Sequence, residues 1–167
     1  MRILTRILQP DDGSILFNNR IFCDKDIVYI GYLPEERGLY SSMKIAEQLI
    51  FLARLKGLSL SEAKRRTFLW LEKFGLDNRA RHTVGSLSKG LQQKIQFIGA
   101  IICSPQLLIL DEPFSGLDPI STAFMREEIV TLQKQGTTVL LSTHDLNEAS
   151  APVSYTHLRA HETSLHL

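Results

Sequence analysis

The chain has 167 residues, of which 44% are hydrophobic and 22% are charged, a composition that suits one globular domain core. Its 19 Lys and Arg residues nearly balance 18 Asp and Glu residues, so no net field favours a nucleic-acid partner. The isolated Cys23 and Cys103 argue against a disulfide framework or a zinc site, and no apolar run is long enough to span a bilayer.

The N-terminal part of the chain is predicted to contain one short helix and two strands. Apolar residues recur at helical spacing in residues 1–8, which predicts a helix there. Residues 14–18 and 27–33 are predicted to form strands.

Two adjacent helices are predicted next. Residues 42–56 have an amphipathic pattern, and their apolar face consists of Ile45, Leu49, Leu52 and Leu55. Residues 59–74 open with Ser59 and Glu62 in a capping-box pattern. A glycine follows each of the two segments and is expected to end the helix.

Residues 107–111 form the most informative stretch, because four apolar residues run into Asp111 and Glu112. An apolar run without alternation fits a strand that is buried on both faces, as in a parallel sheet covered by helices. Carboxylates at the end of such a strand stand where α/β folds bind ligands. We expect the two side chains to point to opposite sides, so that one can hold a metal while the other handles a water. A strand that runs into an acidic surface loop is the alternative.

The elements around this strand complete an alternating order. Residues 88–103 are predicted to form a helix before it, which stops ahead of a proline. Asp118 and Pro119 are expected to be the N-cap and first residue of the helix after it, and residues 137–142 form the last predicted strand. The predicted fold class is therefore α/β.

Four segments together resemble the motifs of ATP-binding-cassette (ABC) ATPases. Residues 107–119, Leu-Leu-Ile-Leu-Asp-Glu-Pro-Phe-Ser-Gly-Leu-Asp-Pro, resemble the Walker B motif and D-loop. Residues 87–94, Leu-Ser-Lys-Gly-Leu-Gln-Gln-Lys, resemble the signature motif. His144 resembles the switch histidine, and residues 30–37 lie where the family has its Q-loop. The four segments occur in the order that the family shows.

The resemblance covers roughly residues 1–149 and implies a partial P-loop NTPase fold, with a mostly parallel sheet and a helical subdomain over about residues 40–100. The sequences of residues 31–40, GYLPEERGLY, and residues 87–94, LSKGLQQK, most resemble those of ATPases of bacterial exporters of the sodium-export and drug-export type. The family's phosphate-binding Walker A loop, G-x-x-x-x-G-K-[ST], does not occur in the sequence. We therefore expect the reading frame to begin inside the domain; a family member that naturally lacks the loop is the alternative.

Residues 150–167 are expected to be a non-native or disordered tail, because they resemble translated sequencing-adapter read-through. His157 and His161 in this tail have a spacing that could place both on one face of a helix, as a metal pair would be. No third ligand in a supporting frame accompanies them, so we predict no metal site there.

The resemblance implies that Glu112 and His144 are catalytic. Asp111 would hold Mg²⁺, Glu112 would act as the base for the attacking water, and His144 would sense the γ-phosphate of ATP. Asp118 would bind nucleotide as part of the D-loop. For His144 the alternative is an ordinary surface histidine, and for Asp118 it is a plain helix cap.

A second group of residues is implied to bind the cofactor. Ser88, Lys89 and Gly90 open a helix whose N–H groups can face a phosphate, which in this family belongs to the ATP held by a second subunit. Ser88 could equally be only a helix cap. The Q-loop position carries Glu35, or its neighbour Glu36, where the family usually has Gln. A carboxylate there keeps an oxygen for Mg²⁺ but loses the amide donor.

The resemblance further implies an ATP-hydrolysing subunit of an ABC transporter, which uses ATP and Mg²⁺ to drive export. Its partners would be a transmembrane permease subunit and a second ATPase subunit in a head-to-tail dimer, with no nucleic acid, and it would be cytoplasmic and peripheral on the inner face of the cell membrane. The chain alone is expected to be inactive. The alternatives are a soluble non-transport ABC ATPase and a non-catalytic regulatory or binding remnant. The short interval between Glu35 and Ser88 leaves no room for a long coiled-coil insertion, which favours the transporter.

Overall fold

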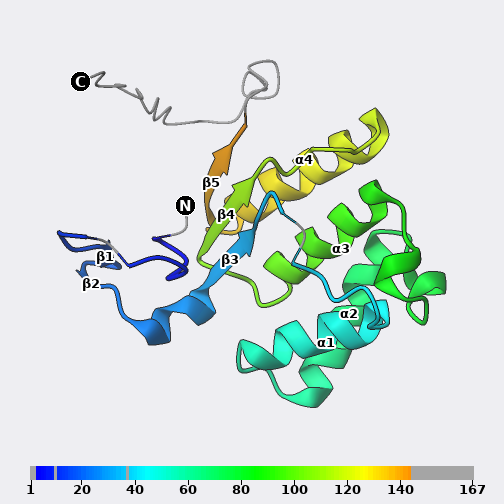
Figure 1. Cartoon of the computed structure of the whole chain (residues 1–167), viewed down its shortest axis with the longest axis horizontal. Helices are drawn as coiled ribbons and strands as arrows, with labels where there is room; N and C mark the ends of the chain where they lie inside the picture. The colour runs from blue at the N-terminus through cyan, green and yellow to red at the C-terminus, as the bar shows by residue number, and fades with distance from the viewer. Residues whose placement is uncertain (1–2, 10, 37, 144–167) are drawn as a thin grey trace.

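The computed structural model describes residues 3–9, 11–36 and 38–143, and Figure 1 shows how its elements are arranged. Its strands are β1 (Leu16–Phe17), β2 (Arg20–Ile21), β3 (Ile30–Leu33), β4 (Leu107–Asp111) and β5 (Thr138–Ser142). Its α-helices are α1 (Ile45–Leu55), α2 (Leu60–Lys73), α3 (Lys89–Ile101) and α4 (Pro119–Lys134). Short 3-10 helices span Asp24–Tyr29, Asp77–Arg79 and Val84–Ser86. Within the described ranges, no helix combines the length and apolar character needed to cross a membrane.

Strands β3, β4 and β5 form a parallel sheet in which β4 is central. Leu108, Ile109 and Leu110 of β4 are fully buried. Leu108 and Leu110 enter the large core formed with the helices, whereas Ile109 packs in a smaller cluster with Phe22. Burial on both faces explains the unbroken apolar run, and the predicted α/β class is confirmed.

The two faces of the sheet are covered by different parts of the chain. All four α-helices contribute side chains to the large core on one face. The N-terminal segment, with the antiparallel pair β1–β2, contributes to the smaller cluster on the other face, and it lies apart from the helices in Figure 1. The helices together form a helical layer on one side of the sheet: α3 and α4 pack directly on the strands, α1 packs on α3, and α2 packs on α1. The carboxyl ends of the three parallel strands point to one edge.

The close packing of α3 on β3 depends on Gly31. A Cβ atom at this position would lie 2.4 Å from the carbonyl oxygen of Ala100 on α3 and 2.9 Å from Cδ1 of Leu108. A side-chain carbon does not approach a backbone oxygen this closely, so only glycine lets the helix lie directly on the strand.

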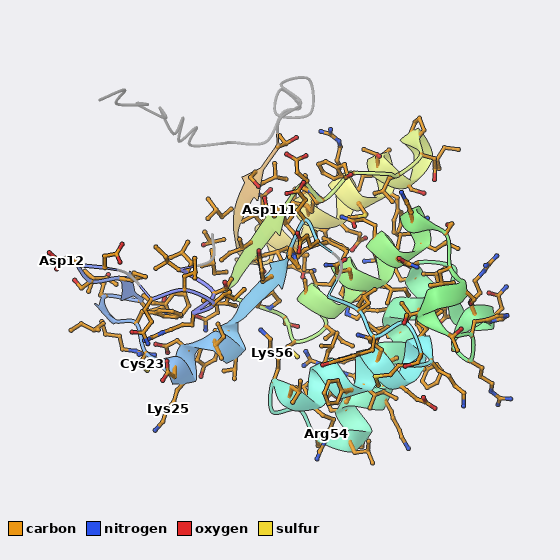
Figure 2. The ribbon with its side chains drawn as sticks, viewed as in Figure 1. Asp12, Cys23, Lys25, Arg54, Lys56 and Asp111 are labelled. Atoms are coloured by element: carbon orange, nitrogen blue, oxygen red, sulfur yellow. The ribbon has the colours of Figure 1, made fainter. Side chains whose placement is uncertain are left out.

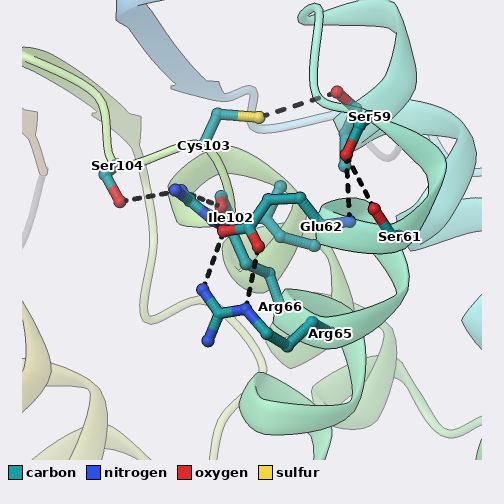
Figure 3. Close-up of polar contacts among 9 residues, drawn as sticks. Ser59, Ser61, Glu62, Arg65, Arg66, Ile102, Cys103 and Ser104 are labelled. Atoms are coloured by element: carbon teal, nitrogen blue, oxygen red, sulfur yellow. Dashed lines mark hydrogen bonds and ion pairs between the residues drawn. The ribbon is translucent and has the colours of Figure 1, made fainter.

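A polar cluster ties α2 to the turn after α3 (Figure 3). The Glu62 carboxylate accepts hydrogen bonds from Arg65 and Arg66, and these two guanidinium groups lower the pKa of Glu62 to about 2. Nη1 of Arg66 also donates to the carbonyl oxygen of Ile102 and to Oγ of Ser104, both at 3.1 Å. Arg66 thus satisfies a carbonyl at the end of α3 that has no partner within the helix.

The three predicted helix caps are confirmed. Ser59, Ser88 and Asp118 precede α2, α3 and α4, and each side chain accepts a hydrogen bond from a backbone N–H of the first turn. The capping box predicted at Ser59 forms only in part, because the Glu62 side chain turns to the arginines of its own helix.

The predicted N-terminal helix is wrong over residues 3–8, which form turns. Arg6 has a φ of 59°, which is incompatible with a right-handed helix, and its Nη2 donates to the carbonyl oxygen of Phe22 at 2.9 Å. The predicted strand at 14–18 is reduced to the two residues of β1. A contact distant in sequence therefore sets the path of this segment.

Two further details differ from the prediction. The strand expected at residues 27–33 begins only at Ile30, because a 3-10 helix occupies the residues before it. On α1, Leu55 is 66% exposed, whereas Gln48 takes a fully buried position beside Leu49. His144 and the tail at residues 150–167 lie outside the described residues, so the statements about them, like the proposed domain bounds, stay predictions.

Candidate functional site

The carboxyl edge of the sheet brings together the ends of three strands. Leu33 of β3 pairs with Leu110 of β4, so Glu35 follows the sheet at nearly the level of Asp111. Asp111 pairs with Ser142 of β5, and Oγ of Ser142 donates to Oδ1 of Asp111. Figure 2 shows Asp111 at the end of β4, beside the end of β3. The arrangement places carboxylate and hydroxyl oxygens at the edge where parallel sheets bind ligands.

Glu112 has a backbone conformation that is unusual for its residue type. Its φ is +47°, in the left-handed region that costs a residue with a Cβ roughly 1–2 kcal/mol. The surroundings hold this conformation from both sides: its N–H donates to the carbonyl oxygen of Ser142 at 3.1 Å, and its own carbonyl oxygen accepts from Nε2 of Gln93 at 3.4 Å. Because β4 ends at Asp111, the expected alternation of side chains along a strand does not extend to Glu112. An enforced backbone outlier of this kind points to a functional site.

The residues at the start of α3 lie at the N-terminus of a helix, whereas Asp111 and Glu112 lie at the end of a strand. Oγ of Ser88 accepts from the N–H of Leu91 at 3.4 Å, so its capping role is present. Ser88 and Lys89 are exposed. A Cβ at Gly90 would lie 3.0 Å from the carbonyl oxygen of Gly116, so the helix start lies against the segment that follows β4.

Asp118 is engaged as a cap. Its Oδ1 accepts from the N–H of Ser121 at 2.9 Å, and its Oδ2 accepts from the Ser121 hydroxyl. The hydrogen bond from the Ser121 hydroxyl, followed by the weaker effect of the Ser121 N–H, holds the pKa of Asp118 below its usual range. The capping alternative is therefore present, and the nucleotide-binding role of Asp118 stays a prediction.

The predicted site residues thus fall into two groups. Glu35, Asp111 and Glu112 lie at the edge of the sheet, whereas the start of α3 and Asp118 flank the loop that follows β4. Gln93 of α3 joins the groups, because its Nε2 donates to the carbonyl oxygen of Pro113 at 3.0 Å as well as to that of Glu112. His144 belongs to the part of the chain that is not described.

Sequence reasoning missed Ser142 and Gln93. The signal for Gln93 was available, since a polar residue on the apolar side of a predicted helix must find a partner when it is buried. Ser142 gave no comparable signal, because its contact with Asp111 depends on the register of two strands that are distant in sequence.

The donor set fits a magnesium ion that arrives with phosphate. The edge offers carboxylate and hydroxyl oxygens, which are the hard ligands that Mg²⁺ prefers. Among residues 3–9, 11–36 and 38–143, no cluster of three or more His, Cys, Asp or Glu side chains could hold a metal alone. Mg²⁺ in nucleotide sites typically uses one or two carboxylates and takes its other ligands from water and phosphates.

Comparisons with known proteins agree with this geometry. Residues 1–115 match the family model described as ABC transporter. An uncharacterized ABC transporter ATP-binding protein of Bacillus subtilis, YhaQ, is 46% identical over 143 residues, which are 86% of this chain and 48% of that protein. The lantibiotic transport ATP-binding protein SrtF of Streptococcus pyogenes is 36% identical over 149 residues, which are 89% of this chain and 63% of SrtF.

A solved structure is similar as well. A structure described as the ATP binding subunit of an ABC transporter has a TM-score of 0.79 and 32% sequence identity, and the match covers 89% of this chain and 63% of that one. The chain spans about half the length of three of the curated relatives that it matches, at 48%, 55% and 53%.

Proposed function

The chain belongs to the ABC transporter family, and from that premise we propose that it forms part of an ATP-hydrolysing subunit that drives export through a membrane permease. The observation that carries the proposal is the edge of the sheet, where Asp111 is oriented by Ser142 beside a conformationally enforced Glu112. Phosphoryl transfer needs a held metal and a group that orients water, and these are the two tasks that adjacent carboxylates can divide.

Bound MgATP supplies the bond to be cleaved and the metal that neutralises charge on the phosphates. Asp111 and Glu35 are the residues that would hold Mg²⁺, and the Ser142 hydroxyl keeps one oxygen of Asp111 in place by donating to it. Glu112 accepts the proton of the attacking water at its carboxylate. Its N–H and carbonyl oxygen are both hydrogen-bonded, so the main chain that carries this base is fixed before substrate binds.

The start of α3 is proposed to serve a second subunit. Ser88 uses its side chain to cap the helix, and the N–H groups of Lys89 and Gly90 remain for an anion. The site would bind the phosphate of the ATP held by a second copy of the subunit, which makes the dimer head to tail. His144, which lies outside the described residues, would sense the γ-phosphate of ATP.

The helical layer offers a surface for the permease. Tyr40, Phe51 and Leu55 are exposed apolar side chains on and just before α1, and the rings of Tyr40 and Phe51 make an edge contact with centroids 6.1 Å apart. Exposed apolar side chains that cluster in this way are typical of a protein interface. Binding there would hold the subunit on the cytoplasmic face of the membrane.

The chain alone is proposed to be inactive. Its sequence contains no G-x-x-x-x-G-K-[ST] loop, and the residues described above would hold the metal and orient water but would make few contacts with the nucleotide. This feature also supports the second candidate, a non-catalytic binding remnant. The two candidate functions can be distinguished with a chimera in which residues 1–149 replace the matching part of the Bacillus subtilis relative YhaQ.

The proposed function predicts that the purified chimera hydrolyses ATP with Mg²⁺ and that the chain alone does not bind MgATP with micromolar affinity by isothermal titration. The matched control is YhaQ itself. A folded chimera that binds ATP but hydrolyses none, beside an active YhaQ, would favour the non-catalytic candidate.

A further inference from the structure

The segment that carries Glu35 is held by buried glutamines of two different helices. Nε2 of Gln96, on α3, donates to the carbonyl oxygens of Pro34 at 3.2 Å and Glu36 at 3.4 Å. Oε1 of Gln48, on α1, accepts from the N–H of Tyr40 at 3.0 Å. The two side-chain amides therefore bind the main chain of this segment before Glu35, at Pro34, and after it, at Glu36 and Tyr40.

In the part of the chain that the structure describes, one end of each glutamine amide has a hydrogen-bond partner and the other end has none. Gln96 faces two carbonyls, so its amide nitrogen must point at them, and its Oε1 is buried without a partner among the described residues. At Gln48 the roles are reversed, and the buried Nε2 has no partner in the same part of the chain. Gln48 is 0% exposed and Gln96 6% exposed. An apolar side chain would avoid these costs, so the two positions are not optimised for stability.

Helices α1 and α3, which carry Gln48 and Gln96, are packed tightly on each other. A Cβ at Gly99 of α3 would lie 2.9 Å from Cδ1 of Leu52 on α1. This contact holds α1 against α3, so both glutamines project from helices that pack on each other. Asp111, in contrast, belongs to the sheet and is held by β5. Glu35 follows the end of β3, so its position relative to Asp111 depends on the path of the segment that the two glutamines hold.

We propose that Gln48 and Gln96 are positioning residues that place Glu35 relative to Asp111. The assignment of these two carboxylates to the metal rests on the proposed function, whereas the hydrogen bonds of Gln48 and Gln96, here called the tethers, do not depend on it. Lys56 offers a matched control, because it also reaches from a helix to two carbonyl oxygens, those of Ile27 and Ile30 at the opposite end of β3. Figure 2 shows Lys56 in that position, between α1 and the 3-10 helix.

The first test measures amide hydrogen exchange in the 167-residue chain and its variants. Gln96→Met and Gln48→Met keep the length of the side chain but remove the amide. Each is expected to speed exchange of the peptide covering residues 34–40 about tenfold, as the loss of one or two net hydrogen bonds implies, while β4 keeps its protection. Lys56→Met should instead affect the peptide covering residues 27–31.

Two exchange results would overturn the proposal. One is a rate for residues 34–40 within twofold of the parent in both variants. The other is a uniform acceleration that includes β4, which would mark a general loss of stability. Gln96→Glu is a second variant of nearly the same shape; it presents oxygen to the two carbonyls and should reproduce the effect of Gln96→Met.

The second test uses the chimera with YhaQ as the parent, because this form is expected to bind ATP, and measures Mn²⁺ binding in the presence of ATP by the electron paramagnetic resonance of free Mn²⁺. If the parent binds, Gln96→Met should weaken the Mn²⁺ affinity about tenfold, as is typical when a partner that orients a metal ligand is lost. An unchanged affinity would overturn the positioning role even if exchange is faster. A parent that binds no Mn²⁺ with ATP would count against the proposed function, and the exchange result would then decide the tethers alone.

Discussion

Gly31→Ala is expected to push α3 away from the sheet. The new Cβ would lie 2.4 Å from the carbonyl oxygen of Ala100, about 1 Å closer than ordinary contact, and this neighbour is backbone that cannot rotate away. Overpacking of this kind typically costs about 1–3 kcal/mol, which lowers Tm by roughly 2–12 °C in a chain of this length. A shift of α3 by a large part of 1 Å would also stretch the bonds of Gln96, which at 3.2 and 3.4 Å are already near the limit for a hydrogen bond.

The assay is thermal unfolding followed by far-ultraviolet circular dichroism, together with hydrogen exchange of residues 34–40. Gly99→Ala is the matched control on the same helix: its Cβ would meet the end of the Leu52 side chain, which can move, and alanine favours the helix by about 1 kcal/mol. The control should therefore stay close to the parent. If Gly31→Ala unfolds within about 1 °C of the parent, the inference that β3 and α3 are packed without slack is wrong.

Three further predictions concern the site and its surroundings. In the chimera with YhaQ, Glu112→Gln should lower ATP hydrolysis about a hundred- to ten-thousandfold while ATP binding persists, and a rate above half that of the parent would show that Glu112 is not the base. In a hydrolysis-deficient chimera, Ser88→Arg should abolish the ATP-dependent dimer seen by size exclusion, whereas Ser88→Thr, which keeps the cap, should preserve it; a dimer in both would leave Ser88 as a cap only. The bonds from Arg20 and then the Cys23 N–H lower the pKa of Asp26 from 3.8 to about 2, so its stabilisation is complete above about pH 4 and is lost as the pH falls toward 2. Asp26→Asn should unfold at lower urea than the parent at pH 7, and the gap should close near pH 2; a gap independent of pH would contradict this origin.

The sequence by itself determined the elements whose cause is local. The N-cap positions of Ser59, Ser88 and Asp118 followed from residue type, because a short polar side chain satisfies an N–H only a few residues away. The strand ending at Asp111 also followed from the sequence, because an unbroken apolar run is buried on both faces when its strand lies between two layers.

Only the tertiary structure decided the features that depend on distant contacts. Arg6 turns toward Phe22 instead of continuing a helix, and Ser142 reaches Asp111 because two strands pair in one register. The left-handed conformation of Glu112 is held by groups from β5 and α3, and no local pattern in the sequence encodes it. Local propensity amounts to tenths of a kcal/mol per residue, so packing and hydrogen bonds between distant segments override it wherever the two disagree.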